Sequence, residues 1–417
     1  MANTITSDRP SDHPSSWRTP FVVILCGCLI GLLSFGPRSV LGMFLMPISL
    51  ENGWTRDVLS LTIAVQNLMW GIGQPFAGAI ADRFGTVKVF WAGTLMYAAG
   101  LAVMALPLPP LAMHVLSGTL VGLGLAGVSF NLVLACFTKL LPEAKRPMAL
   151  GLGTAASSFG QFVFAPLTPL LIDTLGWQGA LLAFSAVVGL IIPLALALAT
   201  DPKAGIGAGT GEEQSVAATM KTAFGHRSYI YLVLGFFTCG FQLAFITTHY
   251  PPYLADLKMP AWVAGLALAL IGLFNIVGSL TAGWLSGRMS KRWLLVWIYF
   301  ARGAAVLMLL LLPPSPALAL GFAALMGLLW LSTVPPTSGL VALMFGTRYM
   351  AMLYGFVFFS HQVGGFLGVW LGGVLYERTG SYDIVWWLSV LFCVGSALVN
   401  IPIKEEPFRR PAMVPAE

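Results

Sequence analysis

The chain has 417 residues, of which 57% are hydrophobic and 9% are charged, and its mean hydropathy is +0.84. Soluble globular domains carry about 25% charged residues, so this composition excludes an ordinary soluble fold and predicts a protein that spans a membrane. The net charge of +6 does not indicate a nucleic-acid partner, because the basic residues lie between long apolar segments.

Twelve apolar segments follow a polar beginning, and each is long enough to cross a lipid bilayer, which takes about 20 residues. Residues 1–18 are rich in proline and serine and predict a disordered cytoplasmic tail. The first six segments cover 19–48, 56–81, 86–106, 111–138, 147–173 and 177–199. The other six cover 228–255, 260–286, 292–312, 316–345, 350–376 and 382–402.

The glycine-rich stretch 200–226 divides these segments into two groups of six. The sequence therefore predicts an all-α membrane protein with an N-terminal six-helix bundle at 19–199 and a C-terminal bundle at 227–402. A cytoplasmic linker at 200–226 joins the bundles, and a short cytoplasmic tail follows at 403–417.

The basic residues predict how the chain is oriented. If the N-terminus is cytoplasmic, 17 of the 22 lysines and arginines fall on the cytoplasmic side. Only Arg56, Lys258 and Arg378 fall outside, so the positive-inside rule places both termini in the cytoplasm. Short loops and the lack of a targeting signal indicate the inner (plasma) membrane of a bacterium.

A charged loop joins the second and third segments and carries the spacing Gly-x-x-x-Asp-Arg-x-Gly-x-x-Lys. Its members are Gly78, Asp82, Arg83, Gly85 and Lys88. The loop resembles the signature between helices two and three of the major facilitator superfamily. We expect it to act as a conformational latch at the cytoplasmic surface, where the glycines let helix ends approach closely.

A weaker copy of this loop lies 205 residues later and contains Gly283 and Arg288. It has Gly287 where the first loop has Asp82, so the second latch has lost its acid. Residues 157–176 and 361–380 also align, at a constant offset of 204. The resemblance implies two pseudo-symmetric six-helix bundles that bind substrate between them and work by alternating access.

The interiors of the predicted spans contain basic residues, whereas the carboxylates near them all fall at outer helix ends, which favours an anionic substrate. Arg38 lies about 18 residues into the first span, where a charge costs about 2.5–3.5 kcal/mol and needs compensation. One interpretation is a guanidinium that bends toward the membrane surface or bonds helix carbonyls. The other is a guanidinium that holds a substrate carboxylate by two parallel hydrogen bonds.

Three short motifs sharpen the resemblance toward monocarboxylate transporters and the related oxalate/formate exchanger. The tripeptide around Arg38, Pro-Arg-Ser, is similar to a Pro-Lys-Ser in the first helix of monocarboxylate transporters, whose lysine is implicated in proton and substrate binding. Residues 145–155 are similar to the signature with which helix five begins in that family. Residues 354–361 resemble an exchanger segment with an anion-binding lysine at the position of His361. One departure is Ser279, because both relatives carry an arginine at that point of helix eight.

Two histidines are candidates for carrying a proton. His361 lies about 11 residues into the eleventh span and is either a satisfied core residue or a titratable group that also attracts an anion. Because no acid is buried, His361 is the first candidate for proton coupling, together with Arg38. His249, in the outer third of the seventh span, is the second and is also a candidate for substrate binding.

Arg302 and two amides complete the candidate substrate site. Arg302 belongs to a helix that resembles an outer supporting helix, so bonding to neighbouring helices is the first interpretation and substrate binding the second. Asn131 and Gln161 lie on helices that approach the cavity in the family fold, although such residues often only join helices.

Other functional classes find little support in the sequence. The five cysteines all lie in apolar runs, which predicts neither a disulfide framework nor a metal site. No nucleophile–base pair or nucleotide-binding loop is present, so we expect no enzyme activity and no cofactor.

The sequence thus predicts a monomeric secondary transporter in the lipid bilayer that moves a small organic carboxylate, of the lactate or pyruvate type, with a proton. Exchange against a counter-anion is an alternative to proton symport. The rival functions are an exporter or facilitator of a neutral or amphipathic molecule and, in a different class, a membrane-bound sensor.

Overall fold

The computed structural model describes residues 17–142, 145–200, 216–346 and 350–407. These residues form helices and short connections, and no β-strand occurs among them. The fold prediction of an all-α membrane protein is confirmed, because ten helical stretches are long and apolar enough to cross a membrane. Most of both predicted tails, residues 201–215 of the predicted linker and the side chain of Asp82 lie outside the described part.

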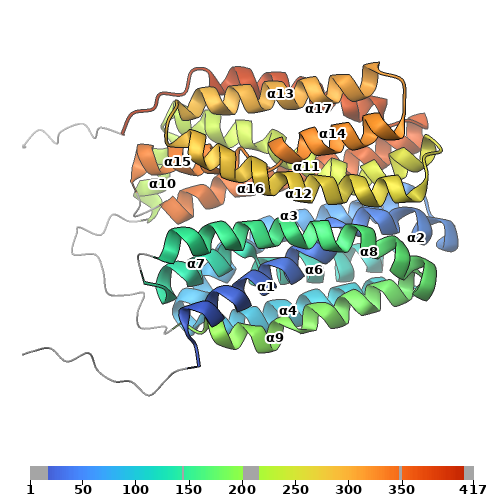
Figure 1. The fold of residues 1–417 in the computed structure, drawn as a ribbon, viewed down its shortest axis with the longest axis horizontal. Helices are drawn as coiled ribbons and strands as arrows, with labels where there is room; N and C mark the ends of the chain where they lie inside the picture. Colours follow the sequence, from blue (N-terminus) through green and yellow to red (C-terminus); the bar gives the residue numbers. More distant parts are fainter. Residues whose placement is uncertain (1–16, 143–144, 201–215, 347–349, 408–417) are drawn as a thin grey trace, which may run out of the picture.

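The first half of the chain folds into a helical bundle, drawn from blue to green in Figure 1. Its elements are α1 (Pro20–Ser39), η1 (Leu41–Phe44), α2 (Leu45–Asn52), α3 (Arg56–Phe84), α4 (Thr86–Met104), α5 (Pro110–Ala112), η2 (Met113–Gly118), α6 (Thr119–Gly127), α7 (Phe130–Leu140), α8 (Arg146–Gly189), α9 (Ile191–Leu194) and η4 (Ala195–Leu198).

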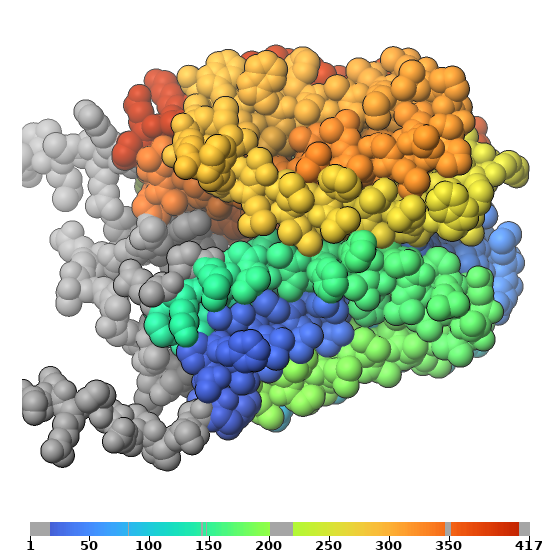
Figure 2. Space-filling model, viewed as in Figure 1, coloured from blue at the N-terminus to red at the C-terminus, as the bar shows by residue number. Residues whose placement is uncertain are grey.

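The second half forms the bundle drawn from yellow to red, and the two bundles lie side by side (Figure 1). Its elements are α10 (Val216–Phe224), α11 (Arg227–Asp256), α12 (Ala261–Ser286), α13 (Lys291–Leu311), α14 (Pro316–Leu329), α15 (Val334–Phe345), α16 (Met350–Thr379) and α17 (Asp383–Asn400). Figure 2 shows the surface of α8 directly against that of α12 on one face of the molecule.

The ten apolar stretches account for eleven of the twelve predicted spans. One stretch, Met148–Leu198, contains two predicted spans, because α8 is interrupted at Gly176, whose φ of 71° is favourable only for glycine. The second predicted span corresponds to the 29-residue helix α3, which is not one of the ten stretches.

α2 and α10 mark opposite ends of the bundles (Figure 1). We call them the α2 end, where α3 begins at Arg56, and the α10 end, where α3 finishes at Phe84. At the α2 end, a Cβ built on Gly42 of η1 would overlap with the backbone of Thr247 and Thr248 in α11, which shows close contact between the two halves.

The contact between the halves is lost toward the α10 end. A Cβ built on Gly71 of α3 would lie 2.7 Å from Cβ of Gln362 in α16. Seven residues away on the same helix faces, Gly78 of α3 and Gly355 of α16 have no such neighbour within 4 Å. Residues two turns apart share a helix face, so α3 and α16 diverge between these two levels.

α8 and α12 diverge in the same way. A Cβ built on Gly272 of α12 would lie 2.8 Å from the carbonyl oxygen of Ser158 in α8. One built on Gly151, seven residues before Ser158, would meet nothing within 4 Å. The structure is therefore closed between the halves at the α2 end and more open at the α10 end.

The predicted latch residues lie at the α10 end. Gly85 links α3 and α4 with a φ of 89°, which explains why a glycine stands there. The expected close approach at the other glycines is not seen in this conformation, because a Cβ built on Gly78 or on Gly283 would meet no atom of another helix within 4 Å. Arg288 instead lies 4.0 Å from the ring centre of Trp284, and Arg83 is exposed.

The tail supplies an acid beside the second, acid-free latch loop. Glu405 Oε1 accepts hydrogen bonds from the Ser290 hydroxyl, at 2.5 Å, and from the backbone N–H of Arg292, at 2.8 Å. The Arg292 guanidinium in turn donates to the carbonyl of Ile403, at 3.1 Å. A carboxylate at the N-terminus of α13 also offsets the partial positive charge of that helix end.

We expect the Glu405→Gln variant to be less stable at pH 7 by about 0.3–1 kcal/mol, the usual contribution of a charge at a helix terminus. Partial burial alone would raise the pKa of the Glu405 carboxyl, but the hydrogen bonds from Ser290 and from the Arg292 backbone lower it. A carboxyl with a lowered pKa stabilises the fold above its unfolded-state pKa, about 4.3, and loses this effect as the pH falls through the folded-state pKa.

Thermal unfolding in detergent at pH 7 and at pH 4 measures this difference, which should shrink at the lower pH. The Glu406→Gln variant serves as the matched control, because Glu406 is the exposed neighbour of Glu405. Identical melting of wild type and Glu405→Gln at pH 7 would contradict the assigned role.

Candidate functional site

Arg38 is a buried cation near the end of α1. Its side chain is 8% exposed, and its Nη2 donates a hydrogen bond to Oδ1 of Asn67 on α3. The guanidinium carbon also lies 5.6 Å from the ring centre of Trp70, one helical turn beyond Asn67. The buried Nε–H has no acceptor in the part of the chain that the structure describes. Arg38 is thus held by an amide and a ring, and its buried Nε–H is unsatisfied.

Two aromatic rings connect Arg38 with the second half of the chain. Trp70 of α3 packs edge-on against Phe358 of α16, with ring centres 5.5 Å apart. Phe358 stacks in turn on His361, at 5.6 Å and an interplanar angle of 8°. Gln74 orients the indole by accepting its N–H at 3.0 Å. The tertiary structure therefore places Arg38 and His361 on either side of the Trp70–Phe358 pair.

His361 lies on α16 among residues of the second half. It is half-buried, and its Nδ1 is 3.2 Å from Oε1 of the adjacent Gln362. Its ring centre is 5.3 Å from that of Phe236.

Arg302 binds the end of a broken helix. It is fully buried, and its Nε and Nη2 donate to the carbonyl of Leu329 at 3.1 and 2.6 Å, while Nη2 also donates to the carbonyl of Trp330. These carbonyls lie where α14 ends, and residues 330–333 separate that end from α15, which begins at Val334. The terminal carbonyls of a helix lack partners within the helix, so Arg302 fills a structural need. These contacts agree with the first of its two interpretations.

The two predicted amides differ in their surroundings. Gln161 is buried on α8, and its amide N–H donates to the carbonyl of Leu268 on α12, at 3.1 Å. It therefore joins the two halves rather than pointing to a free space. Asn131 is half-buried in the first turn of α7. Neither amide contacts Arg38 in the structure as described.

Ser279 takes part in a second polar contact between α8 and α12. Its hydroxyl donates to Oδ1 of Asn275 at 3.0 Å, and the Asn275 amide donates to the hydroxyl of Ser158 at 2.8 Å. Asn275 also accepts the backbone N–H of Leu331. The position at which the resemblance leads us to expect an arginine is therefore neutral and bonded within the protein.

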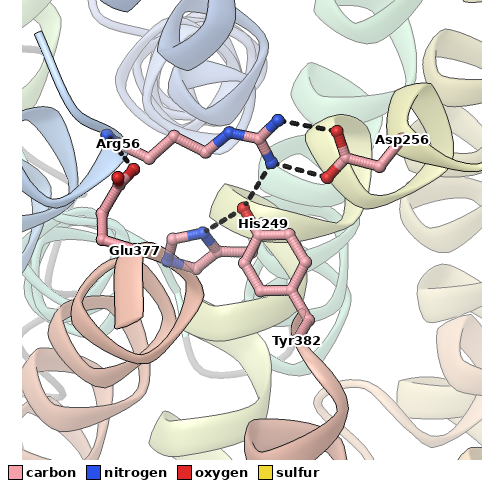
Figure 3. A network of polar contacts seen from close by, with 5 residues as sticks. All are labelled: Arg56, His249, Asp256, Glu377 and Tyr382. Atoms are coloured by element: carbon pink, nitrogen blue, oxygen red, sulfur yellow. Dashed lines mark hydrogen bonds and ion pairs between the residues drawn. The ribbon is translucent and has the colours of Figure 1, made fainter. Parts of the chain in front are cut away.

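The strongest polar network is one that the sequence analysis did not single out, and it lies at the α2 end (Figure 3). Arg56, the first residue of α3, forms a bidentate ion pair with Asp256 at the end of α11, with both N–O distances 2.7 Å. The backbone N–H of Arg56 donates to Glu377 of α16 at 2.7 Å, and its guanidinium donates to the hydroxyl of Tyr382 at 3.1 Å. One residue of the first half thus holds three helix ends of the second.

His249 belongs to this network. It is fully buried on α11, and its Nδ1 lies 3.3 Å from the Tyr382 hydroxyl (Figure 3). Its Nε2 lies 2.8 Å from the carbonyl of Val369. His249 is therefore not beside Arg38, with which the sequence analysis grouped it. The available signal was the opposite charge of Arg56 and Asp256, both predicted at outer helix ends but in different halves.

Comparisons with known proteins agree with this architecture. The family model described as Major Facilitator Superfamily matches residues 27–369 and 263–416. The uncharacterized MFS-type transporter YcxA of Bacillus subtilis is 28% identical over 89% of this chain and 91% of its own length. Monocarboxylate transporter 13 of Bos taurus is 25% identical, over 94% of this chain and 91% of its own length. Monocarboxylate transporter 11 of Mus musculus is 26% identical, over 94% and 88%.

A solved structure supports the same fold. The crystal structure of a D-xylose-proton symporter superposes with a TM-score of 0.70 at 16% sequence identity. The match covers 93% of this chain and 98% of the symporter chain. At this identity the likeness concerns the fold alone.

We expect the Arg302→Gln variant to lower the free energy of unfolding by about 2 kcal/mol, because buried carbonyls at the end of α14 lose their donors. Thermal unfolding in detergent measures this loss, and Arg288→Gln, which replaces an exposed arginine, is the matched control. Unchanged stability combined with lost substrate binding would instead support the substrate role of Arg302.

Proposed function

Because the chain belongs to the Major Facilitator Superfamily, we propose that it carries a small organic carboxylate across the membrane by alternating access. It is a multi-pass membrane transporter and not an enzyme. The proposed substrates are monocarboxylates of the lactate or pyruvate type, accompanied by a proton. The proposed location is the inner (plasma) membrane, where the protein acts as a monomer.

The observation that carries the carboxylate proposal is the state of Arg38. Its charge is buried, it forms no ion pair within the described residues, and its Nε–H has no acceptor. A guanidinium binds a carboxylate best through two parallel N–H groups, of which Nε–H is often one. A substrate carboxylate would both satisfy this donor and neutralise the charge.

The names of two relatives support a carboxylate substrate. The relatives from Bos taurus and Mus musculus are both monocarboxylate transporters and align with nearly the whole chain. Ser279 supports the second candidate, a transporter of a neutral or amphipathic molecule, because it replaces a positive charge by a hydroxyl that is already bonded to Asn275. A panel that contains both acids and neutral compounds separates the two functions.

The conformation fits one state of an alternating-access cycle. The halves are joined at the α2 end through Arg56 and Asp256 and diverge toward Gly78 and Gly355. The excess of lysine and arginine at the α10 end places that end in the cytoplasm in our proposal. The structure then corresponds to an inward-facing transporter whose outer side is closed.

We propose His361 as the group that carries the accompanying proton. It is partly accessible, it lies on the second half, and the Trp70–Phe358 pair separates it from Arg38 on the first half. A protonated imidazole adds positive charge on the far side of this pair. Proton and carboxylate then favour binding of each other through their opposite charges.

We expect Arg38→Gln to reduce carboxylate uptake to background, because glutamine keeps polarity but supplies neither the charge nor the paired N–H groups. The measurement is uptake of radiolabelled lactate and pyruvate into proteoliposomes, together with size-exclusion profiles that report folding. Arg378→Gln, at an exposed arginine of the α2 end, should transport as the wild type does. Unchanged affinity in folded Arg38→Gln protein would refute the role of Arg38.

We expect His361→Gln to uncouple carboxylate uptake from the proton gradient. Wild-type uptake should rise when the gradient is directed inward, whereas uptake by the variant should be the same with and without it. Counterflow of labelled substrate, which needs no gradient, should persist in the variant. A gradient response that survives in His361→Gln would exclude this residue as the proton carrier.

A further inference from the structure

We propose that His249 is a proton-binding site that operates the outer closure of the transporter. In its neutral form it completes the network around Arg56 that joins the two halves, and in its protonated form it repels Arg56 and releases that contact. This inference rests on the proposed alternating-access function, and it assigns proton-dependent opening to a site separate from Arg38 and from His361.

The partners of His249 determine where its hydrogen lies. The carbonyl of Val369 can only accept a hydrogen bond, so Nε2, at 2.8 Å, carries the hydrogen and donates. A neutral imidazole then has an unprotonated Nδ1, which accepts from the Tyr382 hydroxyl at 3.3 Å. The Tyr382 oxygen itself accepts from the Arg56 guanidinium, at 3.1 Å. The hydrogen bonds therefore form one directed chain, in which Arg56 donates to Tyr382, Tyr382 donates to His249, and His249 donates to the carbonyl of Val369.

A second proton on the ring disrupts this order. Protonated His249 donates from Nδ1 as well, so the Tyr382 hydroxyl can no longer donate to it and must turn its own hydrogen elsewhere. The ring has no space to rotate away on the α16 side, because a Cβ built on Gly372 would already overlap with it. The protonated ring therefore stays beside Tyr382, where the hydroxyl hydrogen has lost its acceptor on His249.

The charge of the protonated ring is not neutralised by the nearby acids. Asp256, on the same helix, is engaged in the bidentate pair with Arg56, and Glu377 of α16 accepts the backbone N–H of Arg56. The other facing groups are the phenols of Tyr382, at the start of α17, and of Tyr376, which packs on it with ring centres 4.6 Å apart. The charged group that faces His249 across the network is thus the Arg56 guanidinium, and two buried like charges repel each other.

The repulsion acts between the two halves of the transporter. Arg56 belongs to α3 of the first half, whereas His249, Tyr382 and Asp256 all belong to the second (Figure 3). Separation of Arg56 from this group opens the α2 end, which faces the outside in our proposal. A proton taken up from the outside therefore favours the conformation that admits substrate from that side.

The test is a distance measurement by double electron–electron resonance on the full chain in lipid nanodiscs, without substrate. Spin labels are attached to Thr55→Cys and Thr379→Cys, two exposed positions at the α2 end in different halves, after the five native cysteines are replaced by serine. Coupling between sites in proteins is typically on the order of 5–150-fold, so we expect the long-distance population to rise about tenfold between pH 8 and pH 5.

His249→Gln should remove this pH response, because glutamine cannot bind the proton. His114→Gln is the matched control and should retain the response, since His114 lies at the same end but bonds to Thr62 within the first half. Tyr382→Phe provides a second variant, which should raise the long-distance population at pH 8 by removing the link between Arg56 and His249. The proposal is overturned if wild-type distances do not depend on pH, if His249→Gln responds like the wild type, or if Tyr382→Phe matches the wild type at pH 8.

These outcomes can be separated from those of the substrate proposal. The distance measurement contains no carboxylate, so a pH-driven opening stands even if no member of the carboxylate panel is transported. Conversely, carboxylate uptake that requires Arg38, combined with pH-independent distances, would retain the proposed function and remove only the role of His249.

Discussion

The structure depends most on how the positive charges of three buried arginines are stabilised inside a bundle of membrane-spanning helices. Arg302 binds the terminal carbonyls of α14, where a helix lacks internal partners. Arg56 is paired with a carboxylate from the other half of the chain. Arg38 has an amide and an aromatic ring, which leave its Nε–H without an acceptor. Removing a charge from water is costly, so each mode of compensation indicates a different role.

An arginine whose charge is stabilised by groups of its own half suits a permanent structural contact. An arginine whose charge is stabilised by the other half suits a contact that forms and breaks. The Arg56–Asp256 pair is of the second kind, and it lies at the end where the halves approach most closely. Arg56 also contacts Glu377 of α16 at this end, and the glycines of α3 and α16 show that these two helices diverge toward the opposite end. The rigid helices thus convert a polar contact at one end into a change of separation at the other.

The two halves share a fold but not their polar chemistry. The first latch loop carries Asp82, whereas the second lacks an acid of its own and has Glu405 from the tail placed beside it. In the central region, the first half supplies Arg38 and the second supplies His361. In our proposal, this asymmetry lets the transporter bind an anion on one side of the Trp70–Phe358 pair and a proton on the other.

The sequence by itself determined the fold class and the inventory of charges. Long apolar runs have few ways to satisfy their backbone in a membrane, so helices and their approximate bounds follow from composition. The latch spacing and the two-half repeat then indicated the superfamily. The sequence also showed that Arg38 and Arg302 lie in the interior of predicted spans while the acids stay at span ends, because a charge stands out in an apolar segment.

Only the tertiary structure decided which of these residues meet. Arg38 and His361 are 323 positions apart and are joined through Trp70 and Phe358, which the sequence did not link. His249 was grouped with them, but α11 carries it to the network of Arg56 at the α2 end. Helical periodicity shows which face of a helix a residue occupies but not which neighbour covers that face. The neighbour is set by how helices far apart in the chain pack together. This packing decides whether a residue lies beside Arg38 in the proposed substrate site or in the network that joins the two halves.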